Sequence, residues 1–176
     1  MFDSMGSILE ALSPEQQIAC STQNNILLTA CPGSGKTRTL THRLAYQVLR
    51  DPASKKIKIA ITYTNRAAEE ITNRLEGMNI DQSSIWAGTI HQFCMHFIIR
   101  PYAMYSKRLC KGYRIIDDYS KKAYGREIAE RLGMHLNYYD DPFQYENVRT
   151  EYKRVLKEKK EIDFDAILLI SEELLA

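Results

Sequence analysis

The feature that most constrains the fold of this chain is a glycine-rich segment between a short apolar run and a helical pattern. The apolar run occupies residues 26–29, and the segment ACPGSGKT follows at residues 30–37. Glycines let backbone N–H groups turn toward an anion, and the first turn of a helix adds its dipole. Strand, glycine-rich loop and helix in this order are typical of a P-loop, which holds the phosphates of a nucleoside triphosphate. The sequence therefore predicts a nucleotide-binding loop.

The residue types in this loop predict distinct roles. Lys36 would reach the β- and γ-phosphates, and the Thr37 hydroxyl would hold Mg²⁺, so these two are the predicted catalytic residues. Alanine takes the place of the usual first glycine. The alternative is an ordinary Gly/Ser turn. The loop residues predicted to contact the nucleotide are Ala30, Cys31, Pro32, Gly33, Ser34, Gly35, Lys36 and Thr37.

Composition is that of a soluble globular domain. Hydrophobic residues make up 44% of the chain and charged residues 26%, and the net charge of +2 is too small to indicate nucleic-acid binding by itself. The four cysteines show no C-x-x-C pairing, which favours a reduced, cytoplasmic protein. The N-terminus lacks a basic leader pattern, and no apolar run reaches membrane length. We therefore expect a cytoplasmic protein without a membrane partner.

The first hundred residues alternate between strand and helix patterns. Strands are predicted at residues 25–30, 57–63 and 85–87. Helices are predicted to begin with a Ser13/Gln16 capping box, after the loop up to Asp51, from Thr64 or Asn65 to a stop at Gly77, and over residues 90–99 before Pro101. Such alternation favours a parallel sheet with helices on its faces.

The pattern changes after Pro101. Residues 101–114 are basic and rich in tyrosine, and the Lys107–Arg114 cluster is a candidate DNA surface because few acids lie near it. A helix begins at Asp117 or Asp118, and a highly charged helix covers residues 145–160. Its basic residues are interleaved with glutamates at helical spacing, which favours a salt-bridged, solvated helix. The predicted fold is an α/β parallel-sheet core with an α-helical insertion.

Four further segments resemble motifs of a known family. LSPEQ at residues 12–16 resembles a Q motif, and IAITYTNRAA at 59–68 resembles helicase motif Ia. GTIHQFC at 88–94 resembles motif Ib, and IDFDAIL at 162–168 resembles the helix just before motif II. They occur in the order found in UvrD/Rep-like superfamily 1 DNA helicases. The chain is therefore identified as resembling the N-terminal portion of that family, from about residue 12 to residue 175.

The resemblance implies a fold, an activity and partners. The fold would be a P-loop NTPase (RecA-like) core, with residues 1–100 and 161–176 in an incomplete domain 1A. Residues 101–160 would form a helical insertion resembling subdomain 1B. The activity would be that of an ATP-dependent DNA helicase, a single-strand translocase of 3′-to-5′ polarity that uses ATP and Mg²⁺. Single-stranded DNA and the rest of the helicase, domains 2A and 2B, would be its partners.

The resemblance also implies roles for side chains outside the loop. Gln16 would read the adenine edge, or it only completes the capping box. Arg38 would lie near the nucleotide, or it is a solvated helix residue. Tyr63 would stack on single-stranded DNA, or it packs at the end of the sheet. The predicted contacts to the DNA backbone are Thr64, Asn65, Thr89 and His91, with a helix-capping role as the alternative for His91.

ATP hydrolysis also needs a metal-binding carboxylate of the Walker B type. In the family it belongs to motif II, which would follow the helix at residues 162–175. Residues 115–118 and 168–172 are the internal candidates, and neither combines a buried strand with a terminal aspartate. We therefore expect an N-terminal portion that binds ATP without turning it over. The alternatives are a non-catalytic nucleotide- or DNA-binding regulatory module, and a small P-loop kinase with Asp117 or Asp118 as metal ligand.

Overall fold

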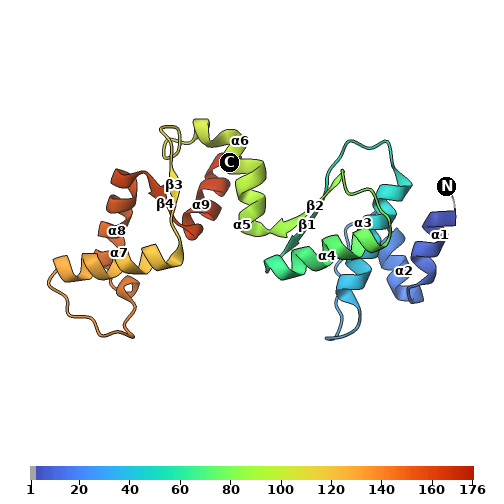
Figure 1. Cartoon of the computed structure of the whole chain (residues 1–176), viewed down its shortest axis with the longest axis horizontal. Helices are drawn as coiled ribbons and strands as arrows, with labels where there is room; N and C mark the ends of the chain where they lie inside the picture. The colour runs from blue at the N-terminus through green and yellow to red at the C-terminus, as the bar shows by residue number, and fades with distance from the viewer. Residues whose placement is uncertain (1–2) are drawn as a thin grey trace. The chain divides into compact units, whose positions relative to one another are not determined.

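A computed structural model of the chain describes residues 3–176 as a mixed α/β structure. They form two compact units, one that ends at Ile90 and one that begins at His91 (Figure 1). Within the described residues, each unit carries a two-stranded parallel sheet. The assignment of residues 1–100 and 161–176 to one domain and 101–160 to another stays a prediction.

The elements of the first unit are α1 (Asp3–Glu10), α2 (Pro14–Ser21), α3 (Lys36–Arg50), β1 (Lys58–Thr62), α4 (Asn65–Gly77) and β2 (Ile85–Thr89). Those of the second unit begin with α5 (Ile90–Phe93), the π-helix η1 (Cys94–Ile99), α6 (Arg100–Tyr102), η2 (Ala103–Tyr105) and β3 (Arg114–Ile115). They continue with α7 (Asp118–Arg131), η3 (Pro142–Gln144), α8 (Glu146–Lys159), β4 (Glu161–Ile162) and α9 (Phe164–Leu175). The strands predicted at 57–63 and 85–87 are confirmed as β1 and β2.

The core of the first unit lies on one face of its sheet. Ala60 of β1 packs in a cluster with Leu44 and Val48 of α3 and with Ile71 and Leu75 of α4. All five side chains are buried, because alternate residues of a strand point to opposite faces and the helices cover only one of them. On the opposite face, Ile59 and Ile61 remain 40% and 46% exposed.

The strand expected at residues 25–30 does not form. This segment has no regular secondary structure, and Ile26, Leu27 and Leu28 are exposed, Leu27 to 90%. A strand is stable only when its backbone groups pair with a neighbour. Within residues 3–176, β1 pairs with β2 and no strand lies beside residues 25–30. The prediction of a buried strand before the loop was therefore wrong for these residues.

Two helix ends also differ from expectation. Gly77 is the last residue of α4 rather than its stop, and the positive φ that follows belongs to Asn79. The helix after β2 passes through Pro101 in α6 instead of ending before it. A π-helix precedes the proline, with the N–H of Arg100 donating to the carbonyl of Met95 five residues back. The wider π turn accommodates a proline that a regular helix interior rejects.

The second unit has two apolar clusters. One joins η1 to α9 through residues such as Ile98, Ile99 and Ile167, and the other joins α7 to α8 through residues such as Ile128 and Val148. The segment at residues 162–168 that resembles the helix before motif II is confirmed as helical from Phe164 on, in α9, whereas Ile162 belongs to β4 and Asp163 is the N-cap.

The charged helix expected at residues 145–160 is confirmed as α8. Its arginines form ion pairs along the helix: Arg149 with Glu146, and Arg154 with both Glu151 and Glu158. For these arginines the salt-bridged interpretation is confirmed.

Gly125, in the interior of α7, tests the packing of the second unit. A Cβ there would lie 2.9 Å from the Phe143 ring, which itself packs against Tyr152 with ring centroids 4.9 Å apart. We expect Gly125→Ala to destabilise the unit by about 1–3 kcal/mol through overpacking, although alanine is the better helix former by about 1 kcal/mol. Urea unfolding followed by far-ultraviolet circular dichroism measures the change.

Gly77→Ala is the matched control. A Cβ at Gly77 in α4 meets nothing within 4 Å, so this variant should gain about 0.4–1 kcal/mol of stability. A Gly125→Ala variant as stable as Gly77→Ala would contradict the close packing of Phe143 on α7.

Candidate functional site

The glycine-rich loop leads into α3 through two residues in the left-handed region. Gly33 has φ +80° and Gly35 has φ +87°, conformations that glycine adopts at little cost. Gly35 is the N-cap of α3, and the helix start has no side-chain capping hydrogen bond and no acidic residue in its first turn. The N-terminal backbone N–H groups and the positive end of the helix dipole are therefore available to an anion.

Lys36 lies folded over its own loop. Its exposed ammonium group donates to the carbonyls of Ala30 at 2.6 Å and Cys31 at 2.8 Å, and the Ser34 hydroxyl donates to the Cys31 carbonyl at 2.7 Å. A phosphate bound at the start of α3 would replace two neutral acceptors of Lys36 with charged ones. Charge-assisted bonds of this kind are the stronger ones, so the exchange favours the phosphate.

Gln16 connects α2 to the loop. Its Oε1 accepts from the Ser13 N–H at 3.1 Å and completes the predicted capping box, which is confirmed. Its Nε2 donates to the Ser34 carbonyl at 3.0 Å, and a Cβ at Gly35 would lie 3.0 Å from that nitrogen. Both ends of the amide are therefore occupied. Sequence reasoning missed the contact with Ser34 because it joins residues eighteen positions apart.

Other side chains hold α3 against the preceding helices. Arg38 donates to the Ala11 carbonyl at 2.7 Å, and Arg43 donates to the Ala19 carbonyl. Arg38 thus contacts the α1–α2 turn, and its predicted place near the nucleotide stays a prediction. The Cys20 thiol bonds to the Thr39 carbonyl at 3.3 Å, and burial raises its pKa above the ordinary value, which keeps it protonated.

Thr37, the predicted Mg²⁺ ligand, is partly buried in the first turn of α3. Its carbonyl accepts from the Thr41 hydroxyl at 2.8 Å. A hydroxyl beside a phosphate site suits Mg²⁺, which takes oxygen ligands from a few protein groups, from phosphates and from water. Within residues 3–176, no group of three or more His, Cys, Asp or Glu side chains lies in a metal-binding arrangement.

The polar residues predicted to contact DNA in the first unit lie at the carboxyl edge of its sheet. Thr62 and Thr89 are register partners, so the chain segments that follow β1 and β2 begin side by side. Tyr63, directly after β1, is 98% exposed, which excludes the alternative of a tyrosine packed against the sheet end. Asn65, at the start of α4, is also exposed.

Thr64 has a structural role at this edge. Its hydroxyl accepts from the Ala67 N–H at 3.2 Å as the N-cap of α4, and its carbonyl accepts from the Thr62 hydroxyl at 2.9 Å. These bonds fix the backbone at Tyr63, so the exposed ring is presented from an ordered turn. The capping role predicted for Thr64 or Asn65 is confirmed at Thr64.

His91 and Asp117 belong to the second unit. The His91 ring meets the Phe164 ring edge-on, with centroids 5.7 Å apart. Asp117 caps α7 by accepting from the Ser120 N–H at 2.8 Å, and its bonds to Ser120 lower the pKa of the carboxyl. The cap predicted at Asp117 or Asp118 is therefore confirmed at Asp117.

None of the helices described over residues 3–176 combines the length and the apolarity needed to span a bilayer.

The uncapped helix start, the two glycines at positive φ and the lysine that opens α3 are local features of a phosphate-binding P-loop. The chain belongs to the UvrD/REP helicase N-terminal domain family, whose model it matches over residues 12–141. Membership confirms the family resemblance drawn from the motif order.

The names of two curated relatives are consistent with this family. The chain is 39% identical over 98 residues to the ATP-dependent DNA helicase PcrA of Staphylococcus aureus (strain NCTC 8325 / PS 47), a match that covers 54% of this chain and 13% of the relative. It is 40% identical over 95 residues to PcrA of Bacillus subtilis (strain 168), covering 53% and 13%. The chain thus matches only a small part of the length of these relatives.

Gln16→Glu removes one of the two hydrogen bonds that the Gln16 side chain makes and keeps the other. Glutamate keeps the acceptor that a capping box needs but loses the donor to the Ser34 carbonyl. We expect α2 to be retained and nucleotide affinity to fall about fivefold or more, since a net hydrogen bond contributes about 1 kcal/mol. Titration with a fluorescent ATP analogue measures the affinity.

Gln23→Glu is the charge-matched control, because Gln23 is exposed in the same unit. If Gln16→Glu binds nucleotide as well as Gln23→Glu does, Gln16 serves the helix cap alone.

Proposed function

We propose that this chain is the ATP-binding, DNA-contacting N-terminal part of an ATP-dependent DNA helicase that translocates 3′-to-5′ along single-stranded DNA. The observation that carries the proposal is the open P-loop within a chain that belongs to the UvrD/REP helicase family. The names of the PcrA relatives support it, since they describe ATP-dependent DNA helicases. In this proposal residues 1–100 and 161–176 belong to a RecA-like domain 1A, and residues 101–160 form the 1B insertion.

ATP with Mg²⁺, when bound, supplies the phosphoanhydride whose hydrolysis drives translocation. The backbone N–H groups at the start of α3 would receive the phosphates, and Lys36 would leave the Ala30 and Cys31 carbonyls to pair with them. Thr37 would hold Mg²⁺. The contact from Gln16 to Ser34 would keep the loop ordered between binding events, which reduces the entropic cost of binding.

Single-stranded DNA would lie at the carboxyl edge of β1 and β2. The exposed Tyr63 ring offers a stacking surface that reads no sequence, in keeping with a translocating enzyme. Asn65, Thr64 and Thr89 at the same edge would position the DNA backbone, with His91 as a further contact. The rest of the helicase, domains 2A and 2B, would complete the DNA path in the whole protein.

We further propose that these 176 residues bind ATP without turning it over. Turnover requires a carboxylate on Mg²⁺. The carboxylate of Asp117, one of the two aspartates in the internal candidate at residues 115–118, already caps α7. The regulatory-module alternative shares this expectation and differs in requiring a separate helicase partner. The kinase alternative requires phosphoryl transfer to a small acceptor, unaffected by DNA.

Lys36→Ala tests the nucleotide site. Removing a charge-assisted contact to phosphate costs about 1.5–3 kcal/mol, so we expect ATP affinity to fall by at least tenfold in equilibrium titration. Arg50→Ala, at the other end of α3, is the control and should bind normally. Equal affinity for the wild type and Lys36→Ala would contradict the P-loop assignment.

The same proteins give the steady-state ATPase rate with and without single-stranded DNA. Absence of turnover with retained ATP binding supports a motor that needs further motifs. Turnover that disappears in Lys36→Ala would place a metal-binding carboxylate within these residues, and Asp117→Asn and Asp118→Asn would then identify it.

Tyr63→Ala tests the DNA edge. Loss of one base–aromatic stack should weaken binding of an oligo(dT) by about 1–3 kcal/mol while ATP affinity stays unchanged. Fluorescence anisotropy of labelled oligo(dT) measures the first, and the nucleotide titration measures the second. A parallel loss of both affinities would contradict a specific DNA-stacking role for Tyr63.

A further inference from the structure

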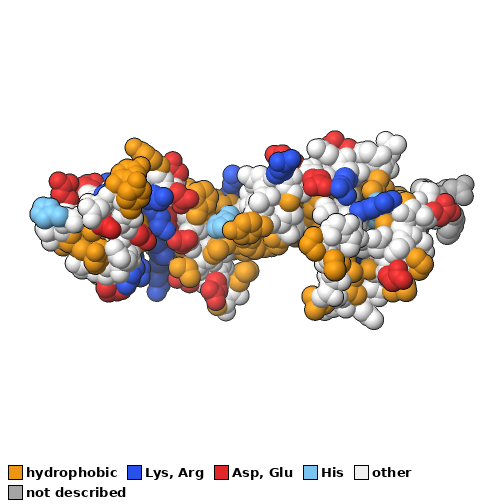
Figure 2. Space-filling view, turned by 90° about the horizontal axis from the view of Figure 1, so that it is seen from below, with side chains coloured by type: hydrophobic (Ala, Val, Ile, Leu, Met, Phe, Trp, Pro, Cys, Tyr) orange, Lys and Arg blue, Asp and Glu red, His pale blue; other side chains and the backbone are white. Residues whose placement is uncertain are grey.

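The second unit carries a large groove, and the residues that line it are distant in sequence from the P-loop and from Tyr63. It has a volume of about 1430 Å³ and is walled by α7, α8, α9 and the loop at residues 132–141. Phe143, Leu156 and Leu169 contribute apolar surface to it. Lys and Arg side chains gather in a band across this unit, beside hydrophobic side chains (Figure 2).

Two exposed tyrosines stand on the loop that borders the groove. Tyr138 is 83% exposed and Tyr139 is 93% exposed, and their rings meet edge-on with centroids 5.4 Å apart. Exposure of this degree shows that the fold gains little from burying either ring. A third tyrosine, Tyr119 of α7, lines the groove and is 83% exposed. Aromatic rings so exposed are available to stack on a flat ligand.

The loop that carries Tyr138 and Tyr139 is held in place from α7. The Arg126 guanidinium donates to the carbonyls of Asn137 at 3.3 Å, Tyr138 at 2.5 Å and Asp140 at 3.4 Å. It also lies 5.7 Å from the centroid of the Tyr138 ring. Three bonds from one side chain order the loop in advance, so a ligand that stacks on the rings would not bear that entropic cost.

Basic side chains follow the two helices of the groove at helical spacing. Arg149, Lys153 and Lys157 repeat every fourth residue along α8, a stripe of about 12 Å. Lys122 and Arg126 do the same on α7. In the part of the chain that the structure describes, the ion pairs do not include Lys122, Lys153 or Lys157.

Most of the aspartates that line the groove already form an ion pair or accept a hydrogen bond from another residue of the chain. Asp163 and Asp165 pair with Lys121 at 3.4 and 2.5 Å. Asp140 accepts from the Asn137 N–H at 2.7 Å, and Asp141 accepts from the Phe143 N–H at 3.0 Å. Seven lysines and arginines line the groove against five aspartates. The side chains that line the groove therefore carry a small net positive charge.

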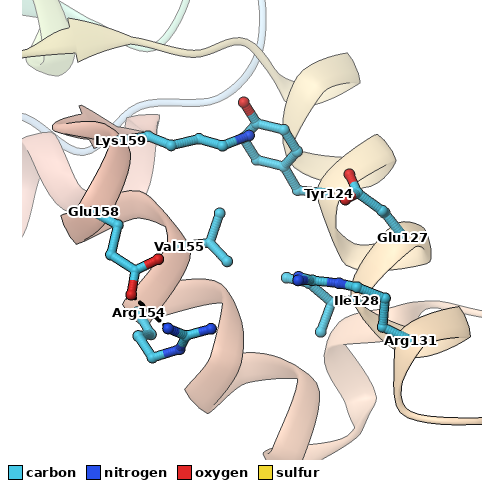
Figure 3. Close-up of a pocket in the computed structure, with 8 residues that line it drawn as sticks. All are labelled: Tyr124, Glu127, Ile128, Arg131, Arg154, Val155, Glu158 and Lys159. Carbon is cyan, nitrogen blue, oxygen red and sulfur yellow. Dashed lines mark hydrogen bonds and ion pairs between the residues drawn. The ribbon is translucent and has the colours of Figure 1, made fainter.

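A second pocket of this unit differs in these respects. It lies between α7 and α8, has a volume of about 130 Å³ and is shown in Figure 3. Its cations are engaged: Lys159 lies 4.1 Å from the centroid of the Tyr124 ring, and Arg154 pairs with Glu158 at 2.5 Å. The groove instead combines exposed tyrosine rings with three lysines, Lys122, Lys153 and Lys157, that form none of the ion pairs described above.

We propose that the groove binds single-stranded nucleic acid, with bases stacked on Tyr138 and Tyr139 and phosphates held by Lys122, Lys153 and Lys157. A basic groove with interleaved aromatic rings is the arrangement that binds single strands without reading sequence. Duplex lacks free base faces and would engage the lysines alone. The inference rests on the proposed DNA-directed function and adds a second contact region to it.

The first test is positional. The full chain is cross-linked to an oligo(dT) of about 12 nucleotides that carries 5-iodouracil, and the attached peptides are identified by mass spectrometry. Cross-links at Tyr138 or Tyr139 are expected. Cross-links at Tyr63 alone would overturn the groove and leave the proposed function standing. Cross-links at Tyr138 or Tyr139 but not Tyr63 would support the groove and contradict the Tyr63 assignment.

The second test is energetic. Tyr138→Ala/Tyr139→Ala should weaken oligo(dT) binding by at least fivefold in anisotropy, with little change for a blunt duplex of the same length. Tyr102→Ala, an exposed tyrosine of the same unit outside the groove, is the control. Equal effects on the single strand and the duplex would overturn the stacking. An unchanged affinity, as expected of a groove that takes an acidic peptide instead, would overturn the proposal as a whole.

The charge of the groove is tested through the salt dependence of DNA binding. Lys153→Gln/Lys157→Gln should flatten the slope of log K against log salt concentration by about 1.4, the value for two phosphate contacts on a single strand. Lys55→Gln/Lys56→Gln removes the same charge from exposed positions of the first unit and should leave the slope unchanged. Equal slopes for the two double variants would overturn the phosphate contacts.

Discussion

The parallel pairing of β1 with β2 is the constraint on which the first unit depends. Its register places Thr62 opposite Thr89, so the residues after each strand meet at one edge. The same register turns Ala60 into the helix-covered core and leaves Ile59 and Ile61 on the bare face. A shift by one residue would exchange the two faces, burying the isoleucines and exposing the core position. The position of the candidate DNA edge is therefore tied to the packing of the core.

The glycine-rich loop depends on contacts from outside itself. Residues 25–30 form no strand before the loop, so the contacts that hold the loop in place come from side chains of α2 and α3. Gln16 holds the Ser34 carbonyl, and Arg38 joins the first turn of α3 to the Ala11 carbonyl. The loop is thus supported by contacts from the helices on either side of it, and the start of α3 that follows it has no side-chain cap.

A buried polar cluster organises the second unit. Asp163, the N-cap of α9, accepts from the Tyr152 hydroxyl at 3.1 Å, from the Ala166 N–H at 2.9 Å and from Lys121 at 3.4 Å. Burial and the charge of Asp163 raise the pKa of Tyr152, which stays a neutral donor. One carboxylate thereby joins α7, α8 and α9, the three helices that wall the groove. The fold and the proposed second contact region share this anchor.

The sequence by itself determined the features that depend on neighbouring residues. The capping box of Ser13 and Gln16 follows from side chains within one turn, and for the caps at Thr64 and Asp117 the sequence narrowed the choice to two neighbouring residues. The tertiary structure alone decided the rest. Residues 25–30 stay unpaired because a strand needs a neighbour, and the Gln16–Ser34 bond and the groove join segments that are distant in sequence. Local patterns carry no information on such partners, because they arise only when the chain has folded.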